Sequence, residues 1–569
     1  MIARLLAAFS VIALAAAPAA ADTLLDNVEG ISINRDGVVT RFRAMLIRED
    51  GVILQIFKRG EKPPSKVDYR IDGRGRTVIP GLVDSHAHVV AMGFAAVALD
   101  LSDAASLAEA QAKIAAYSAK FPDRPWIVGE GWNEEKWGLG RFPTAAELDA
   151  VVADRPVWLV REGGTVGWAN GRALEAAGID AKTADPPGGR IERVAGTRAP
   201  AGVLVDGAMQ LVRGKLPAPR AEDRDRAFLA AQDMLLRHGV TAVADMGTTI
   251  ADWQSFRRAG DAGNLRIRVM AYAASVDDMA LIGGPGPTPW LYDDRLRLNG
   301  LKLRIDGVLN SRSALLKQPY ADDPRTSGIA ALNPTQLRNL MSRAAMDGFQ
   351  MAVHANGDAS AAELLAAIEE LGETYSGDRR WRVEHAQVID PADFPRFGRY
   401  GIVASVQPLR QTSDRAIAEA RLGLGRLAGA YAWRSIAQAG APLAFGSDAP
   451  AGKFDPFAAL AAAVSREDQN GQPFGGWQPQ EALTREQALA ASTAGGAYAG
   501  FGEGRFGRLA VGERADFVML DEDPLLASAQ DLRRLQVLGV WISGQQVYDP
   551  ASRAAAPPPD YDDGEAFGR

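Results

Sequence analysis

The sequence predicts an α/β protein with three parts: a (β/α)8 TIM barrel, a composite β-sandwich domain built from both termini, and a subdomain inserted after the first barrel strand. Eight apolar, strand-like segments, mostly separated by amphipathic helical segments, suit a closed parallel barrel. Short segments with a period of two residues occur near both ends of the chain. The first two barrel strands are separated by far more than one helical crossover, which indicates an insertion.

The terminal segments predict the sandwich. After the first 21 residues, short apolar runs alternate with turns, and Asp50-Gly51 is a strong hairpin signal. A matching set of short strands lies near the other end of the chain. Because short strands at both termini need partners, we expect residues 22–78 and 501–550 to form one composite domain.

The barrel is predicted over residues 79–500. Its first strand is the apolar run that ends at His88, and the other seven are expected at 241–245, 266–272, 301–305, 350–354, 381–385, 402–407 and 442–446. An inserted subdomain is expected over the barrel mouth at about 120–215, since long loops there usually carry specificity. The tail, 551–569, is rich in Ala and Pro and is expected to be disordered.

Composition and charge exclude several classes of function. The chain is 47% hydrophobic and 23% charged, which is ordinary for a soluble globular enzyme. Its net charge is -7, and no run of Lys and Arg could follow a phosphate backbone, so nucleic acid is not an expected partner. The absence of cysteine excludes a disulfide framework, a thiolate nucleophile and a lipidated cysteine.

Residues 1–21 predict a secretory signal peptide. Arg4 precedes an apolar stretch, and three alanines before Asp22 provide a cleavage site of the Ala-x-Ala type. The stretch is short for a membrane span, although an uncleaved anchor is the alternative. We therefore expect an exported protein, periplasmic in a cell with an outer membrane, with no stable membrane insertion after cleavage.

Histidines mark the ends of several predicted barrel strands. His86 and His88 are two residues apart, so in a β conformation both imidazoles face the same way and can bind one cation. The alternative is that they cap a core strand as polar residues. His354 and His385 also end predicted strands, at the edge where barrel active sites lie. The fifth histidine, His238, precedes a glycine at a helix end and is expected to be structural.

Asp448 follows the eighth predicted strand, between small residues that leave room beside it. Alone it would more often be a turn or helix-cap residue. Together with four imidazoles it forms a nitrogen and oxygen donor set that suits zinc, and less well Mn, Ni or Fe.

Lys302 opens an otherwise buried strand, so its amine must either pair or lose its charge. A neutral amine can add carbon dioxide and become a carbamate that bridges two cations. The alternative is a salt bridge to Asp306 or another barrel carboxylate, which the spacing alone favours.

These motifs resemble the amidohydrolase superfamily. The resemblance rests on the run 80–88, on His354 and His385, and on Gly446-Ser447-Asp448. More closely, the chain is similar to amidohydrolase family 3, in its YtcJ-like branch, which includes N-substituted formamide deformylases. The further blocks that carry this likeness are 129–132, 301–307, 354–358, 384–387 and 507–517.

The resemblance implies a role for each candidate ligand. His86 and His88 would hold a first metal, His354 and His385 a second, and a carbamate on Lys302 would bridge the two. Asp448 would bind the first metal and act as general base. The cofactor would be a divalent metal, with Zn2+ favoured, present as two ions if Lys302 is carbamylated and otherwise as one.

The activity implied is hydrolysis of a C–N bond in a small amide, N-formyl compound or imide by a metal-activated hydroxide, within class EC 3.5. Glu384 and Asp358 are expected to orient the imidazoles. The residues that we expect on loops near the mouth, as substrate contacts, are Arg312, Tyr320, Gln407, Arg410 and Trp477. Either Arg312 or Arg410 could hold a substrate carboxylate, and the alternative is that each is a solvated surface arginine.

One position departs from the family pattern. Thr165 stands where the branch typically has a histidine, ahead of Trp168-Ala169-Asn170. If that histidine polarises the substrate carbonyl, another donor must do so here or the substrate differs.

Two other functions stay open. A mononuclear deaminase of the same superfamily would use the four histidines and Asp448 and leave Lys302 unmodified. A non-catalytic exported protein that binds a small molecule is the other alternative, favoured only by Thr165. The partner is a small-molecule substrate in the enzyme readings, and a homodimer is left open.

Overall fold

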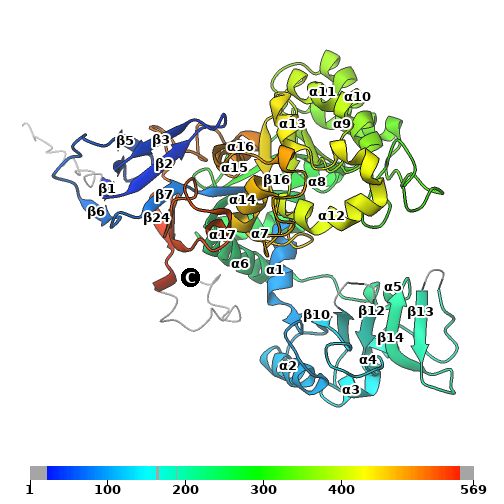
Figure 1. Ribbon diagram of the computed structural model, residues 1–569. Helices are drawn as coiled ribbons and strands as arrows, with labels where there is room; N and C mark the ends of the chain where they lie inside the picture. The colour runs from blue at the N-terminus through cyan, green and yellow to red at the C-terminus, as the bar shows by residue number, and fades with distance from the viewer. Residues whose placement is uncertain (1–21, 162–163, 165, 187–188, 552–569) are drawn as a thin grey trace, which may run out of the picture. The chain divides into compact units, whose positions relative to one another are not determined.

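The computed structural model describes residues 22–161, 164, 166–186 and 189–551. The chain forms two compact units (Figure 1): one comprises Gly93–Ala230, and the other comprises the rest of the described chain. The predicted signal peptide, Thr165 and nearly all of the predicted tail lie outside the described residues. Of the helices that are described, none is both long and apolar enough to cross a bilayer.

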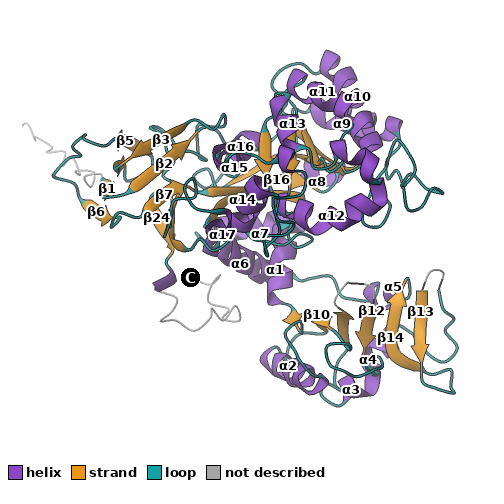
Figure 2. Ribbon diagram, viewed as in Figure 1, coloured by secondary structure: helices purple, strands orange, loops and turns teal. Residues whose placement is uncertain are grey.

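The larger unit contains an eight-stranded parallel sheet in the order β21-β20-β19-β18-β17-β16-β15-β8. Helices surround these strands (Figure 2). The strands are β8 (Leu82–Ala87), β15 (Val240–Thr248), β16 (Arg268–Ala273), β17 (Leu296–Arg304), β18 (Gln350–Ala355), β19 (Arg382–His385), β20 (Val403–Val406) and β21 (Leu443–Phe445). Several strands, including β8, β16 and β18, are buried along their whole length, as expected when both faces of a parallel sheet are covered. The predicted (β/α)8 barrel is confirmed.

The helices of this unit follow the strands in sequence. Between β15 and β21 they are α7 (Ile250–Asp261), α8 (Val276–Gly283), α9 (Pro334–Met346), α10 (Asp358–Thr374), α11 (Phe394–Arg399), α12 (Pro408–Leu422) and α13 (Trp433–Gln438). After β21 come α14 (Pro456–Ser465), α15 (Arg485–Ala491), α16 (Ala494–Ala499) and α17 (Ala529–Leu532), and short 3-10 turns occur at Pro391–Asp393, Leu424–Gly429 and Pro479–Glu481. Local sequence fixes several starts: Thr249 and Asp252 form a capping box at α7, as Asn333 and Gln336 do at α9.

The barrel closes where its first and last strands meet. The backbone N–H of Asp448 donates to the carbonyl of His86 at 2.7 Å, and the N–H of His88 donates to the carbonyl of Ala449 at 2.9 Å. Gly446 permits this approach, because a Cβ atom there would lie 2.6 Å from the backbone nitrogen of His86. Closure therefore places the His-x-His segment and Asp448 side by side.

The β-sandwich uses strands from both ends of the chain, as predicted. One sheet has the order β5-β4-β1-β6 and the other β24-β23-β22-β7-β2-β3. The strands are β1 (Thr23–Asp26), β2 (Glu29–Ile33), β3 (Val39–Phe42), β4 (Ala44–Ile47), β5 (Ile53–Phe57), β6 (Tyr69–Asp72), β7 (Thr77–Pro80), β22 (Phe517–Leu520), β23 (Val537–Ile542) and β24 (Gln545–Tyr548). The N-terminal β7, in blue, pairs antiparallel with the C-terminal β22 (Figure 1). One core cluster contains Phe42, Met45, Phe517 and Trp541, so residues from both termini form a common core.

The smaller unit has its own sheet, in the order β13-β14-β12-β11-β10-β9, and its own core, which includes Trp132 and Trp168. Its strands are β9 (Leu99–Asp100), β10 (Ile127–Trp132), β11 (Val157–Arg161), β12 (Val166–Ala169), β13 (Gly189–Arg193) and β14 (Pro200–Asp206). Helices α2 (Leu107–Lys120), α3 (Ala145–Asp149), α4 (Gly171–Ala176) and α5 (Met209–Arg213) lie within the unit, and its ends fall inside α1 (Val89–Val97) and α6 (Ala221–Arg237). It is wider than the expected insertion at about 120–215, because β9 and α2 belong to its sheet and core.

Candidate metal centre

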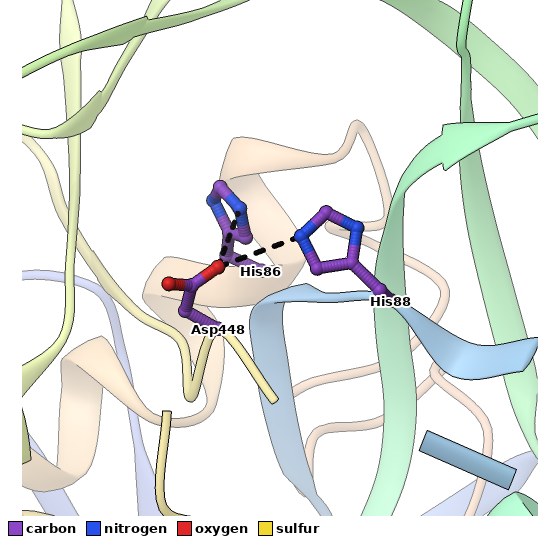
Figure 3. Close-up of side chains that lie close together, drawn as sticks. All are labelled: His86, His88 and Asp448. Atoms are coloured by element: carbon purple, nitrogen blue, oxygen red, sulfur yellow. Dashed lines mark ion pairs between the residues drawn. The ribbon is translucent and has the colours of Figure 1, made fainter. Parts of the chain in front are cut away.

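The first and last barrel strands bring two imidazoles and a carboxylate together. His86 lies in β8, His88 follows this strand, and Asp448 follows β21. The Oδ1 atom of Asp448 lies 3.5 Å from Nε2 of His86 and 3.5 Å from Nε2 of His88 (Figure 3). All three ligand atoms lie within 4.8 Å of one another. Three residues that the sequence singles out as ligands are therefore adjacent.

Two further candidate ligands lie beside this group. His354 lies in β18, and His385 ends the neighbouring strand β19. The ring centroids of His354 and His385 are 4.4 Å apart, and those of His385 and His86 are 4.7 Å apart. The rings of His86 and His88 are separated by 5.6 Å. The four imidazoles form one continuous cluster at the carboxyl ends of the strands, where barrel active sites lie.

Three of these imidazoles have one ring nitrogen held by an oxygen atom. Nδ1 of His86 lies 2.6 Å from Oε2 of Glu384, and Nδ1 of His385 lies 2.9 Å from Oε1 of Gln407. Nε2 of His354 lies 3.0 Å from a backbone carbonyl oxygen. An oxygen acceptor places the proton on the nitrogen that it faces, so His86 and His385 carry the proton on Nδ1 and keep a lone pair on Nε2. Nε2 of His354 also lies 3.1 Å from the amide nitrogen of Asn356.

Burial keeps these imidazoles neutral. It lowers the pKa of His86 to about 4 and that of His385 to about 3, and it holds the pKa of His354 well below its ordinary value. Burial alone would raise the pKa of Asp448, but the neighbouring imidazole of His88 and the charge of Arg410 help to outweigh it and hold that pKa well below its usual range. At neutral pH the ionised carboxylate of Asp448 therefore lies in one cluster with the uncharged rings of His86 and His385.

This arrangement fits a divalent cation. Nε2 of His86 and Oδ1 of Asp448 lie 3.5 Å apart as two acceptors, an arrangement that a positive charge near both atoms stabilises. Two donors about 2.1 Å from a tetrahedral Zn2+ would stand about 3.4 Å apart, close to this separation. A cation would be held by His86, His88 and Asp448, whose imidazole and carboxylate donors suit Zn2+.

A buried ion pair supports His86. Arg382 and Glu384 are both fully buried, and Nε of Arg382 donates to Oε1 of Glu384 at 2.7 Å. Burial would raise the pKa of Glu384, but the charge of Arg382 outweighs it and holds that pKa well below its usual range. Arg382 also donates to the hydroxyl of Tyr272 at 2.9 Å. The carboxylate that orients His86 is thus itself held ionised and in place.

Lys302, in β17, places its amine inside the cluster. Its Nζ lies 3.2 Å from Nε2 of His86, and burial of the amine lowers its pKa to about 8. The spacing alone favours a salt bridge to Asp306, but within the described chain no carboxylate lies within 4.0 Å of this amine. The carboxylate of Asp306 instead accepts hydrogen bonds from the backbone N–H groups of Leu315 and Gly357.

Two buried aspartates that the sequence pattern of the predicted ligands does not single out fix the backbone around the ligands. Oδ1 of Asp84 accepts hydrogen bonds from the N–H groups of His86 and Ser447, both at 3.0 Å, and so ties β8 to the segment of Asp448. Asp245 accepts from the N–H of Val89 at 2.7 Å. Both could be recognised from the sequence as carboxylates inside apolar strands, because a buried carboxylate needs hydrogen-bond partners.

Two candidate ligands have unusual backbone conformations. Asp448 has φ of 58° and His385 has φ of 74°, both in the left-handed region that non-glycine residues rarely adopt. Such conformations cost about 1–3 kcal/mol each and persist where the surrounding structure imposes them. Their occurrence at two members of the cluster is typical of a functional site.

Two of the predicted substrate residues contact the cluster. Gln407 holds Nδ1 of His385, as described above. Nη2 of Arg410 donates to Oδ2 of Asp448 and to the carbonyl oxygen of Ala451, both at 3.0 Å. The two oxygens of Asp448 are therefore divided: Oδ1 faces the histidines and Oδ2 faces Arg410.

The other predicted contacts have partners of their own. Tyr320 is buried and donates from its hydroxyl to the carbonyl oxygen of Ala314, and buried Trp477 packs against Tyr431. Asp358 accepts from the backbone N–H of Lys317 rather than from an imidazole. Substrate contact by Tyr320 or Trp477 stays a prediction.

Arg312 forms a two-pronged ion pair with Asp322 at 2.9–3.1 Å, and Arg421 binds the same carboxylate. We therefore expect Arg312→Ala to change KM for a hydrolysed substrate by less than about twofold, since exposed ion pairs contribute little. Steady-state kinetics checks this expectation. A rise in KM of tenfold or more would instead place Arg312 in contact with substrate.

The fold and the cluster of four histidines with Asp448 place the protein in the class of metal-dependent hydrolases built on a (β/α)8 barrel. A solved structure with the same architecture is an uncharacterized metal-dependent hydrolase from Pyrococcus horikoshii, with a TM-score of 0.73 and 26% identity. The match covers 89% of this chain and 99% of that one. The chain belongs to the amidohydrolase family, whose model matches residues 70–548.

Sequence comparison with individual proteins supports this family assignment. Protein LONG AFTER FAR-RED 3 of Arabidopsis thaliana is 34% identical over 493 residues, covering 83% of this chain and 82% of that protein. The putative amidohydrolase YtcJ of Bacillus subtilis is 32% identical over 514 residues, covering 88% and 95%. The N-substituted formamide deformylase of Arthrobacter pascens is 27% identical over 491 residues, covering 84% and 90%. The resemblance predicted from the motifs is confirmed.

Proposed function

We propose that the protein hydrolyses a C–N bond in a small amide, N-formyl compound or imide, with a divalent cation, Zn2+ for preference, bound by His86, His88 and Asp448. One observation carries this proposal: the ligand atoms of two imidazoles and an ionised carboxylate converge within 4.8 Å of one another. The name of the Arthrobacter pascens relative supports formamides as the first compounds to assay.

A cation at this site would supply Lewis acidity and lower the pKa of water from about 15.7 towards 7. The chain's own residues handle the protons. Water adds to the carbonyl carbon, the C–N bond breaks, and Asp448 accepts one proton from the water and returns it to the leaving nitrogen. The products are a carboxylic acid and an amine, or a carboxylic acid and an amide when the substrate is an imide. Glu384 and Gln407 keep His86 and His385 oriented throughout.

We further propose that Lys302 carries a carbamate and that His354 and His385 hold a second cation. The amine nitrogen would form a bond to the carbon of carbon dioxide and release one proton. Only the neutral amine reacts, and its fraction increases as pH rises through about 8. The position of Nζ, 3.2 Å from Nε2 of His86, supports this role because a carboxylate built there would lie among the candidate ligands.

Metal equivalents per chain, measured on protein purified without chelator, test this scheme. With bicarbonate present we expect about two ions per chain, and fewer when carbon dioxide is removed during metal loading. Loading should become more complete as pH rises through about 8. Lys302→Met is expected to bind one ion at most, independently of bicarbonate.

The outcomes separate the candidate functions. One ion per wild-type chain at every bicarbonate concentration would contradict the carbamate and favour the mononuclear deaminase. No ion after metal supplementation would contradict metal-dependent hydrolysis altogether. Two ions with no hydrolysis of formamides, amides or imides would contradict the bond assignment.

A further inference from the structure

An open cavity of about 450 Å3, lined by both polar and apolar groups, lies beside the catalytic carboxylate proposed above. Its walls come from the start of α12, from the segment after Asp448 and from the loop after α14. Arg410 and Lys453 are the cations in its lining, and Asp468 is the carboxylate. The chemistry described above does not use this space.

Arg410 connects the cavity to the proposed centre. Its Nη2 atom is held by Asp448 and by the carbonyl oxygen of Ala451, which fixes the plane of the guanidinium. Its Nε and Nη1 atoms have no hydrogen-bond partner among the described residues, and the side chain is 28% exposed. One edge of the guanidinium is therefore anchored, and donors on the other side remain available.

The charges in the lining favour an anion. Lys453 is exposed and forms no ion pair among the described residues. The carboxylate of Asp468 accepts hydrogen bonds from the backbone N–H groups of Asn470 and Gln472, so its charge is engaged in shaping its own loop. Lys453 thus adds a cation without an ion-pair partner to the lining, and Arg410, although paired with Asp448, keeps donors that are not engaged by the described residues.

We propose that this cavity is a subsite for a carboxylate carried by the substrate, so that the preferred substrates are N-acyl or N-formyl amino acids rather than neutral amides. The inference rests on the proposed hydrolysis of a C–N bond and narrows its substrate class. A planar guanidinium with free donors matches the two oxygens of a carboxylate, and Lys453 adds a second charge-assisted hydrogen bond. Because Arg410 also contacts Asp448, an anion bound there lies next to the scissile bond.

The first test compares two substrates that differ only in this charge, N-formyl-leucine and N-formyl-leucinamide, on the metal-loaded enzyme. We expect kcat/KM to be about 10- to 100-fold higher for the acid, the range for hydrogen bonds to a charged group. Equal values for the two compounds would overturn the subsite while leaving the proposed hydrolysis intact. If the enzyme hydrolyses neither compound, the proposed hydrolysis of N-formyl compounds is contradicted.

Lys453→Met provides a variant that leaves Asp448 and Arg410 untouched. We expect it to reduce the preference for the acid about two- to fivefold without changing kcat/KM for the amide. Lys58→Met, an exposed lysine in the β-sandwich, removes the same charge elsewhere and should leave the preference unchanged. An equal effect of both substitutions would show that only net charge matters and would overturn the assignment.

Binding to metal-free protein gives a readout that does not depend on activity. Calorimetric titration should detect phenylacetate but not phenylacetamide, and Lys453→Met should weaken the binding of phenylacetate by a similar factor of about two to five. Equal binding of the two compounds would overturn the proposal. Displacement of phenylacetate by inorganic phosphate at lower concentration would also overturn it, because the subsite would then recognise phosphate.

Discussion

Replacement of Asp448 by asparagine is expected to lower kcat about 10²- to 10⁴-fold while the barrel stays folded. Asparagine preserves the shape and an oxygen that can still accept from Arg410, but it cannot take up a proton at neutral pH. The measurement is kcat on protein whose metal content has been determined. Wild-type activity with metal still bound would contradict the role of Asp448 as general base.

Asp358→Asn is the matched control for this substitution. Asp358 also lies near the carboxyl end of a barrel strand, at the start of α10, but it accepts a hydrogen bond from the backbone N–H of Lys317. The asparagine side chain can accept the same bond, so we expect kcat to change less than about threefold. A large loss in both variants would indicate general sensitivity to altered charge at the barrel mouth.

The strand pattern was sufficient to predict the fold and the location of the cluster. Parallel strands of a barrel all present their carboxyl ends at one edge, so a histidine at the end of a predicted strand is placed without knowledge of the packing. His86, His354 and His385 could be located in this way. Asp448 could be located because it follows the eighth strand, and the backbone bonds between Asp448 and His86 show how closure brings them together.

The partners of these ligands could not be predicted, because each depends on side-chain geometry between distant segments. Gln407, predicted as a substrate contact, instead accepts a hydrogen bond from His385. Arg410, predicted to be either a substrate contact or a solvated arginine, forms an ion pair with Asp448. Arg312 is similar in sequence character to Arg410, yet its partner is Asp322. Spacing along the chain carries no information about which of two arginines reaches the site.

The bounds of the smaller unit also could not be predicted from the sequence pattern. β9 has two residues, too few to give a periodic signal, and it joins the sheet only by pairing with β10. Helix α2 likewise belongs to this unit because Ala110 and Ile114 lie in its core. Such assignments follow from tertiary contacts rather than from local propensity.

The second large effect is expected from Arg382→Met, which leaves Glu384 as an unpaired buried charge. Removing one partner of a buried ion pair costs about 3–5 kcal/mol, so the metal-free protein should unfold at lower denaturant concentration. Glu384 should then regain a proton more easily and orient His86 less well. We expect the affinity for Zn2+, measured by competition with a chelating dye, to fall about 10- to 100-fold.

Arg268→Met is the control that separates the loss of stability from the loss of Zn2+ affinity. Arg268 and Asp516 form another buried arginine–carboxylate pair, at 2.6 Å, but Asp516 contacts no candidate ligand. This variant should lose a similar amount of stability and keep the affinity for Zn2+. Arg382→Lys retains the charge and should recover part of both properties. Equal losses of Zn2+ affinity in Arg382→Met and Arg268→Met would mean that Arg382 acts only through stability, and that the orientation of His86 does not depend on it.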